Sequence, residues 1–301
     1  MKLGRISLSI LGVTVTTLAH AWDSSGHRVV AQIAWQTLME MHSPAAAKLQ
    51  KIFAGAKLPV KDLATAATVP DQIKQARYNH SGFPTSTAFN PYHYLDRPIP
   101  KSKPFTDGNP GKNALVMLPK VEESLATDTT KQQLWDVAWI CHLTGDLHQP
   151  LHSATHYWPT LLAGDHFDRG GNSFLLETVP AAEDPWKTAH PKSSSTYPNE
   201  LHSFWDGLVT GGEGDGAAKV ATRLMGEHPR SAYVAAELSA PAQTWADESY
   251  TLAATKVYSA DIHLYQKPSD DYRAKAKKIA EEWVALAGYR LAMVLDKWLG
   301  H

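Results

Sequence analysis

The stretch HLTGDLHQPLH, from His142 to His152, combines imidazole and carboxylate side chains at a spacing suited to binding a metal ion. His142 and Asp146 lie four residues apart, and the apolar residues before them predict a helix, so both side chains share one helical face. Pro150 ends regular helix soon afterwards, and the chain can return His152 toward the same site from another direction. The stretch therefore predicts a metal site.

A second pair of residues repeats this arrangement later in the chain. His202 and Asp206 lie four residues apart in ELHSFWD, on a short helical pattern. A histidine and a carboxylate one turn apart are the ligands that a helix can give to zinc. We therefore expect this segment to contribute to the metal site as well.

The first 21 residues have the pattern of an export signal. Lys2 and Arg5 precede an apolar run that ends at Leu18, and small residues suited to cleavage come before Trp22. We expect residues 1–21 to be a signal peptide, residues 22–301 to be the functional domain, and the protein to be periplasmic or secreted. No other apolar stretch approaches the roughly 20 residues of a membrane span, so no membrane insertion is expected.

Charge and cysteine content exclude several classes of protein. Of 29 basic and 30 acidic residues, only Lys2 and Arg5 lie in the predicted signal, so the mature chain is slightly acidic. It lacks the basic field of a protein that coats duplex nucleic acid. Cys141 is the only cysteine, so no intramolecular disulfide can form. On a helix it points about 100° away from His142, and we expect a core residue rather than a ligand.

Apolar residues recur at helical spacing through most of the chain, which predicts one all-α domain with at most a small β-hairpin. Pro70 interrupts the helical segment 62–74 and puts Asp71 in the first turn of a new helix. The only plausible strand material is Ser173 to Val179. We find no internal repeat and no linker that would separate domains. The other expected helices are Gly26 to Met41, Ala45 to Phe53, Asn113 to Leu125, Gln132 to Leu147, Ala217 to Met225, Ser231 to Leu238, Pro241 to Lys256 and one that Ser269 or Asp270 caps.

A series of motifs along the chain resembles a known family. They are WDSSGH starting at Trp22, VPDQI, YHYLD, HLTGDLHQPLH, DRGGN, LHSFWD and AGYRLA. Their order and spacing are similar to those of the zinc-dependent single-strand-specific nucleases of the S-one and P-one type. With one cysteine and one glycosylation sequon, at Asn79, the chain looks like a bacterial member rather than a disulfide-bonded eukaryotic one.

The resemblance implies three zinc ions and nine ligand residues. The first ion would bind Asp71, His93, His142 and Asp146; the second Trp22, His27 and Asp146; the third His152, His202 and Asp206. These donor types suit zinc. Trp22 would bind through its free amine and carbonyl, and the amine exists only after signal cleavage, so export and metal assembly would be linked.

The family's activity implies a phosphodiesterase. Single-stranded DNA and RNA would be cleaved at the P–O3′ bond to give 5′-phosphates, and 3′-nucleotides would also be substrates. Two zinc ions, with Asp71 and Asp146 among their ligands, would share a hydroxide that attacks phosphorus, and the remaining zinc would neutralise the departing 3′ oxygen. Lys74, one helical turn after Asp71, matches a basic residue of the family and would stabilise charge on the phosphate. A solvated surface lysine is the alternative.

The same resemblance implies how a base would bind. Tyr94 would line or stack on the base, and Asp96 would accept a hydrogen bond from its edge. Stacking is worth about 1 to 3 kcal/mol per base and requires an unpaired base, which favours single strands. A core aromatic is the alternative for Tyr94. Asp168 and Asn172, in DRGGN, would orient ligands or line the cleft.

Two other functions are compatible with the same residues. A zinc-dependent phospholipase C uses a similar cluster, although its last motif typically ends in Glu where Asp206 stands. An exported zinc-storage or zinc-binding protein would hold metal without hydrolysing either substrate. Glu200 stands where the family often has Asn, which leaves the hydrogen bonding around the third ion open. No protein partner is evident.

Overall fold

The structure is a computed structural model. It describes residues 22–56, 60–73, 86–127, 130–159, 166–176, 200–209 and 216–301. The predicted signal peptide, Lys74, Asn79 and residues 177–179 of the expected strand material lie outside the described residues.

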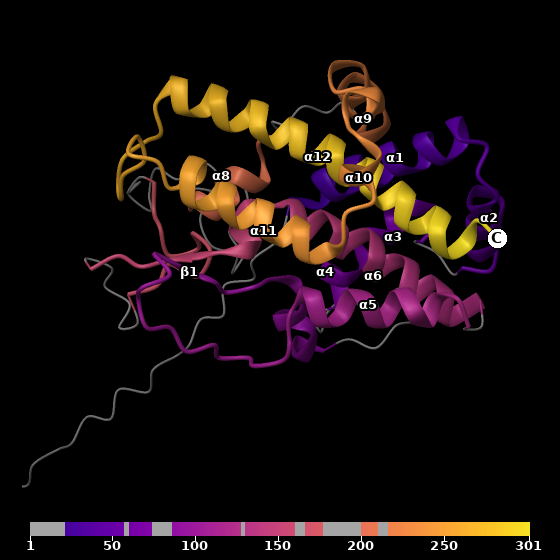
Figure 1. Ribbon diagram of the computed structural model, residues 1–301, viewed down its shortest axis with the longest axis horizontal. Helices are drawn as coiled ribbons and strands as arrows, with labels where there is room; N and C mark the ends of the chain where they lie inside the picture. Colours follow the sequence, from indigo (N-terminus) through magenta and orange to yellow (C-terminus); the bar gives the residue numbers. More distant parts are fainter. Residues whose placement is uncertain are drawn as a thin grey trace, which may run out of the picture.

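Helices make up most of the described chain, and the prediction of a mainly helical domain is confirmed (Figure 1). The first half contains α1 (Ser24–Glu40), α2 (Pro44–Ala54), α3 (Leu63–Ala66), α4 (Val69–Ile73), α5 (Ala114–Leu125) and α6 (Thr130–His148), with the short 3-10 helices η1 (Thr87–His93) and η2 (Pro150–Ser153). The second half contains α8 (Leu201–Asp206), α9 (Ala217–Glu227), η3 (Arg230–Ala232), α10 (Ala235–Leu238), α11 (Ala242–Leu252), the π-helical turn η4 (Ala253–Val257) and α12 (Asp270–Leu299).

Capping residues set several helix starts. The Ser43 hydroxyl accepts the Ala45 N–H at 3.1 Å, with Pro44 as the first residue of α2. Asn113 caps α5 and Ser269 caps α12 in the same way. Pro70 stands near the start of α4, where no helical N–H is needed, so Asp71 lies in the first turn.

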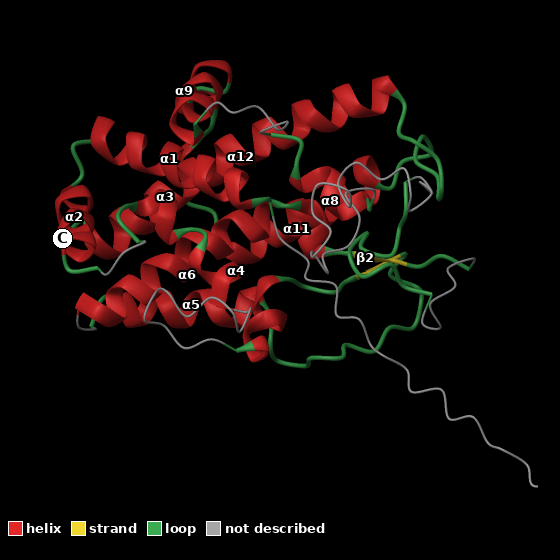
Figure 2. Ribbon diagram, turned by 180° about the vertical axis from the view of Figure 1, so that it is seen from behind, coloured by secondary structure: helices red, strands yellow, loops and turns green. Residues whose placement is uncertain are grey.

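Helix α6 lies at the centre of the bundle. It packs against α1, α3, α4, α5, α11 and α12, and both ribbon views show helices around it (Figures 1 and 2). Cys141 is fully buried and unbridged, as expected, and burial raises the pKa of its thiol. Helices α1 and α12 cross closely at Gly288, where a Cβ would lie 2.5 Å from the Ile33 side chain.

The small sheet in the described chain is a parallel pair rather than a hairpin. Strands β1 (Pro98–Ile99) and β2 (Thr155–His156) pair in parallel, with Pro98 opposite Thr155 (Figure 2). Each strand follows a predicted ligand histidine, and the Leu95 N–H donates to the His152 carbonyl at 2.7 Å. The sheet therefore forms where two chain segments leave the same site. Within the described part of 173–179, Leu175 makes an isolated antiparallel bridge to Glu200.

None of the helices in the described ranges has both the length and the apolar character that a membrane crossing requires.

Candidate metal centre

Eight side chains predicted as metal ligands are buried, none more than 5% exposed. Helix α6 supplies His142 and Asp146, η1 and η2 supply His93 and His152, and α8 supplies His202 and Asp206. His27 comes from α1 and Asp71 from α4. The fold thus brings together residues that are up to 179 positions apart in the sequence.

The first group contains Asp71, His93, His142 and Asp146. The His93 Nδ1 lies 2.9 Å from the His142 Nε2 and 3.2 Å from the Asp146 Oδ2. The Asp71 Oδ1 lies 3.6 Å from the His142 Nε2 and 3.9 Å from the His93 Nδ1. His93, His142 and Asp146 are close enough together to bind a single ion, and so are His27, Asp71 and His142.

Asp146 faces two groups of donors with its two oxygens. Oδ2 lies 3.4 Å from the His142 Nε2, and Oδ1 lies 3.4 Å from the Nε2 of His27. The His27 ring stacks on that of His142, with centroids 3.9 Å apart. Asp146 therefore presents one oxygen to each of two groups of donors.

Trp22 lies at the same end of α1 as His27. The side chain is fully buried, and it lies so close to Gly26 that a Cβ there would be 2.6 Å from the Trp22 Cβ. Asp23 caps α1 through the N–H groups of Ser25 and Gly26, and its own N–H donates to the Asp206 carbonyl at 3.3 Å. The start of the described chain is therefore tied to α8.

The third group contains His152, His202 and Asp206. The Nε2 atoms of the two histidines lie 3.1 Å apart, and the Asp206 Oδ2 lies 3.6 Å from the His202 Nε2. Gln149, which the sequence did not single out as a functional residue, donates its Nε2–H to the Asp206 Oδ1 at 2.7 Å and accepts the Leu151 N–H at 2.6 Å. The sequence signal that could have identified Gln149 is its position inside the His142–His152 motif.

Backbone carbonyls orient three of the histidines. The Nδ1 of His142 lies 2.8 Å from the Ala67 oxygen, that of His152 lies 2.8 Å from the His93 oxygen, and that of His202 lies 2.6 Å from the Gly170 oxygen. Each Nδ1 can only donate there, so each Nε2 presents a lone pair to the cluster. Buried lone pairs and carboxylates that converge in this way fit cations such as zinc.

The DRGGN segment closes one side of the third group. Arg169, Gly170 and Gly171 all have positive φ, and a Cβ at Gly170 would lie 2.4 Å from the Leu151 oxygen, so this turn needs glycine. Asn172 donates to the Arg169 oxygen at 2.7 Å and lies 3.2 Å from the His202 Nδ1.

Asp168 is placed differently from Asn172. Its carboxylate accepts the His156 N–H at 2.9 Å and the Trp158 indole N–H at 3.2 Å. These two bonds hold the loop after β2 rather than a predicted ligand. Burial raises the pKa of Asp168 to about 6.

Tyr94 and Asp96 follow His93 directly, at the edge of the cluster, and both are half-buried. Burial, and then the charge of Asp96, raise the pKa of Tyr94 to about 12, so Tyr94 offers a neutral ring and hydroxyl.

Burial raises the pKa of Glu200, which stands just before α8, to about 7, and the charge of Arg169 opposes this shift. Lys74 lies outside the described residues.

Arg290, in the AGYRLA motif, supports the end of α6. It is fully buried and binds both oxygens of Glu248, at 2.7 and 3.2 Å. It also donates to the His148 Nε2 at 3.0 Å, while the His148 Nδ1 lies 2.7 Å from the Thr144 oxygen. Burial, and then the positive charge of Arg290, hold the pKa of His148 well below its usual value. The neutral imidazole can therefore accept from Arg290.

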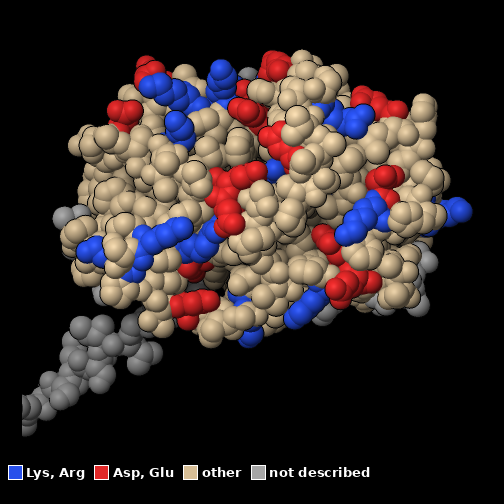
Figure 3. Space-filling model, viewed as in Figure 1, with Lys and Arg blue, Asp and Glu red and all other residues tan. Residues whose placement is uncertain are grey.

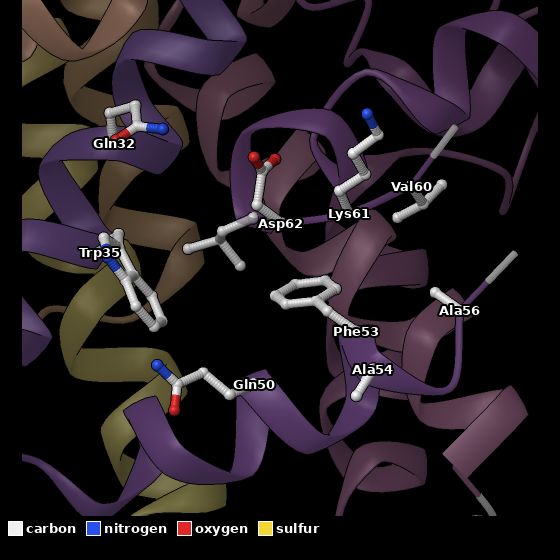
Figure 4. A pocket seen from close by; sticks show the side chains of 10 residues that line it. Gln32, Trp35, Gln50, Phe53, Ala54, Ala56, Val60, Lys61 and Asp62 are labelled. Carbon is white, nitrogen blue, oxygen red and sulfur yellow. The ribbon is translucent and has the colours of Figure 1, made fainter. Parts of the chain in front are cut away.

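A cavity of about 540 Å³ lies elsewhere, between α1 and α2 (Figure 4). Trp35 and Phe53 face it from these two helices, and Lys61 and Asp62 lie at one side. None of the predicted ligand residues lines this cavity.

Comparison with known proteins shows which sequences this chain is similar to. The sequence model of the family described as S1/P1 Nuclease matches residues 22–300. Nuclease S1 of Aspergillus oryzae is 23% identical over 318 residues, which cover 97% of this chain and 96% of that protein.

Proposed function

This chain belongs to the S1/P1 nuclease family, and from that premise we propose that it hydrolyses single-stranded DNA and RNA at the P–O3′ bond, leaving 5′-phosphates. We propose 3′-nucleotides as further substrates. The observation that carries the proposal is the convergence of five histidines and three aspartates, all buried and linked by donor distances of 3.9 Å or less.

The proposed cofactor is three zinc ions. Asp71, His93, His142 and Asp146 would hold the first, Trp22, His27 and Asp146 the second, and His152, His202 and Asp206 the third. Bound zinc would lower the pKa of water and neutralise charge on the phosphate and the leaving oxygen.

Side chains and backbone carbonyls of the protein would position the ions and the substrate. Asp146 faces both His27 and His142, so it would help to hold both the first and the second ion. The carbonyls of Ala67, His93 and Gly170 hold the histidine rings in place before substrate binds. Because the rings are already oriented, the reaction needs no free energy to reorganise them. Lys74, the residue after α4 in the sequence, is the group that we propose binds a phosphate oxygen.

We propose that Tyr94 and Asp96 bind a base and that Asn172 borders the substrate site. The raised pKa of Tyr94 keeps its phenol neutral, which suits stacking on a base near phosphates. The contact between Asn172 and His202 supports a place beside the third group. A base can reach Tyr94 only when it is unpaired, so single strands would be favoured.

Export is part of the proposal. Cleavage after residue 21 would expose the Trp22 amine beside its own carbonyl, a pair that can chelate an ion. The burial of Trp22 and the bond from the Asp23 N–H to the Asp206 oxygen support a place for this terminus at the cluster.

Signal-cleaved protein that starts at Trp22, incubated with a defined single-stranded oligonucleotide, tests the proposal by end-group analysis. We expect 5′-phosphate products, loss of turnover with a chelator, and recovery with zinc. Products with 3′-phosphates would contradict the bond assignment. Hydrolysis of phosphatidylcholine vesicles but not of oligonucleotide would favour the phospholipase, and tight zinc binding without either reaction would favour a storage protein.

A further inference from the structure

Two lysines beside the small sheet have no role in the proposed catalytic site. Lys101 and Lys103 follow β1 directly, and both are exposed. The Lys101 Nζ lies 5.1 Å from the ring centroid of Tyr250, and the Lys103 Nζ lies 4.3 Å from that of Tyr157. We call these two lysines the basic strip. Figure 3 shows a row of Lys and Arg side chains at the end of the molecule where β1 lies in Figure 1.

The charges of the basic strip are available to an anion from solution. Among the described residues, neither lysine has a carboxylate within salt-bridge distance, whereas the neighbouring Arg97 is paired with Asp247 at 2.5 Å. An aromatic ring attracts an ammonium group and orients it without cancelling its charge. The strip therefore presents two oriented positive charges.

The basic strip is connected to the metal centre by hydrogen-bonded backbone. The Thr155 N–H donates to the Arg97 oxygen at 2.9 Å, and the Tyr157 N–H donates to the Ile99 oxygen at 2.8 Å. Lys101 is eight residues from His93, which limits their separation to about 28 Å in an extended chain. Even at the ~3.4 Å per nucleotide of a fully stacked strand, roughly eight nucleotides or fewer cover that distance.

We propose that Lys101 and Lys103 bind the phosphate backbone of a single strand whose scissile bond lies at the metal centre. This inference rests on the proposed function and adds a second contact site for polymeric substrates. A dinucleotide reaches only the metal centre, whereas a longer strand also reaches the strip. The strip therefore favours long substrates through KM rather than kcat.

The test replaces both lysines, Lys101→Gln and Lys103→Gln, and measures kcat and KM for oligothymidylates of two to twenty nucleotides. We expect KM for the 20-mer to rise about three- to tenfold, because two phosphate contacts are lost, and the logarithmic salt slope to shrink by about 1.4. Turnover of the dinucleotide stays within twofold. Arginine at both positions retains the wild-type preference for length.

Lys275→Gln with Lys277→Gln is the control for net charge, because it removes two positive charges at the same sequence spacing from α12, where both lysines are paired with carboxylates. An equal effect from this control, or an equal loss on the dinucleotide, would overturn the inference. If wild-type protein cleaves neither substrate, the proposed function fails instead. Fluorescence anisotropy with a labelled 20-mer then tests the strip alone, and an unchanged Kd in the Lys101/Lys103 variant contradicts it.

Discussion

The Nε2 atoms of His152 and His202 face each other at 3.1 Å, while the Nδ1 of each ring lies within hydrogen-bond distance of a backbone carbonyl. With both Nδ1 protons donated, two lone pairs point at one another inside the protein. Such an arrangement is unfavourable unless a cation binds both nitrogens. The backbone around these histidines thus leaves two buried acceptor nitrogens facing each other, and a bound metal ion would stabilise this arrangement.

Removing metal should therefore destabilise the folded protein. An ion present at a thousand times its Kd stabilises the folded state by about 4 kcal/mol. For a chain of this size each kcal/mol changes Tm by about 2 to 4 °C, so a chelator should lower Tm by at least about 8 °C. Calorimetry with and without dipicolinate measures this change. Zinc should restore Tm and magnesium should not; an unchanged Tm would show that no ion contributes to the fold.

Gln149 should tune metal affinity at the third group. It donates to the Asp206 Oδ1 and accepts the Leu151 N–H, so it fixes the carboxylate relative to η2. Changing a residue that orients a metal ligand typically costs about 10- to 100-fold in affinity or activity. We expect Gln149→Leu to need more zinc for half-maximal activity, as a zinc titration would measure.

Gln133→Leu is the control for this change, because Gln133 lies near the other end of α6 and bonds the Leu125 oxygen. If both variants have the same zinc requirement, the contact between Gln149 and Asp206 does not orient the ligand.

Arg290 should contribute more to stability than any exposed arginine. Its replacement by Leu leaves Glu248 and His148 without a donor in a largely buried network, and breaking a buried pair costs about 3 to 5 kcal/mol. Arg223→Leu breaks the exposed pairs with Glu227 and Glu281 and should cost at most about 1 kcal/mol. Urea unfolding of the two variants measures the difference. Equal losses of unfolding free energy in the two variants would mean that burial does not make the Arg290 contacts more stabilising than the exposed pairs of Arg223.

Much of the helical organisation could be predicted because it depends on local sequence. Ser43 with Pro44, Asn113 and Ser269 are caps whose chemistry acts within one turn. The i, i+4 spacing of His142 and Asp146 likewise placed both on one face of α6. These features need no knowledge of the tertiary structure.

Other features could not be predicted because they depend on distant segments. The parallel pair β1 and β2 joins residues 57 positions apart, and neither strand is long enough to show alternation. Sequence spacing alone also did not predict that His27 and Asp71 lie beside His142. That grouping was implied only by the resemblance to a family with the same order of motifs. The carbonyl of Gly170, which orients His202, has no side-chain signal at all.

Asp168 should make stability depend on pH. Burial raises its pKa from 3.8 to about 6, so the folded protein binds this proton more tightly than the unfolded chain. The group therefore favours folding at low pH, and this contribution, ~3 kcal/mol in total, is lost as pH rises through about 6. We expect Asp168→Asn to reduce the fall in unfolding free energy between pH 4 and 7, measured with zinc present. Asp261→Asn, at an exposed position, is the charge-matched control; if the two variants have the same pH profile, the Asp168 carboxyl is already ionised at pH 4.

Gly145 should be required for activity, because its position leaves room for His27. A Cβ at Gly145 would lie 2.7 Å from the His27 Nδ1, so Gly145→Ala must displace a ring that faces the Asp146 Oδ1. A misplacement of about 1 Å can cost about 100-fold in rate. We expect a loss of about 10- to 100-fold in kcat, with less zinc bound per chain by elemental analysis.

Helix propensity predicts the opposite result for Gly145→Ala. The experiment therefore separates displacement of the His27 ring from the effect of alanine on the helix. Alanine is favoured over glycine inside a helix by up to about 1 kcal/mol, so propensity alone would make Gly145→Ala more stable and fully active. Gly226→Ala in α9 is the matched control, since no atom lies within 4 Å of its added Cβ. It should gain stability and keep wild-type kcat. A Gly145→Ala protein that behaves the same way would mean that His27 can move without loss of function, and that the stacking of His27 on His142 does not position the reaction.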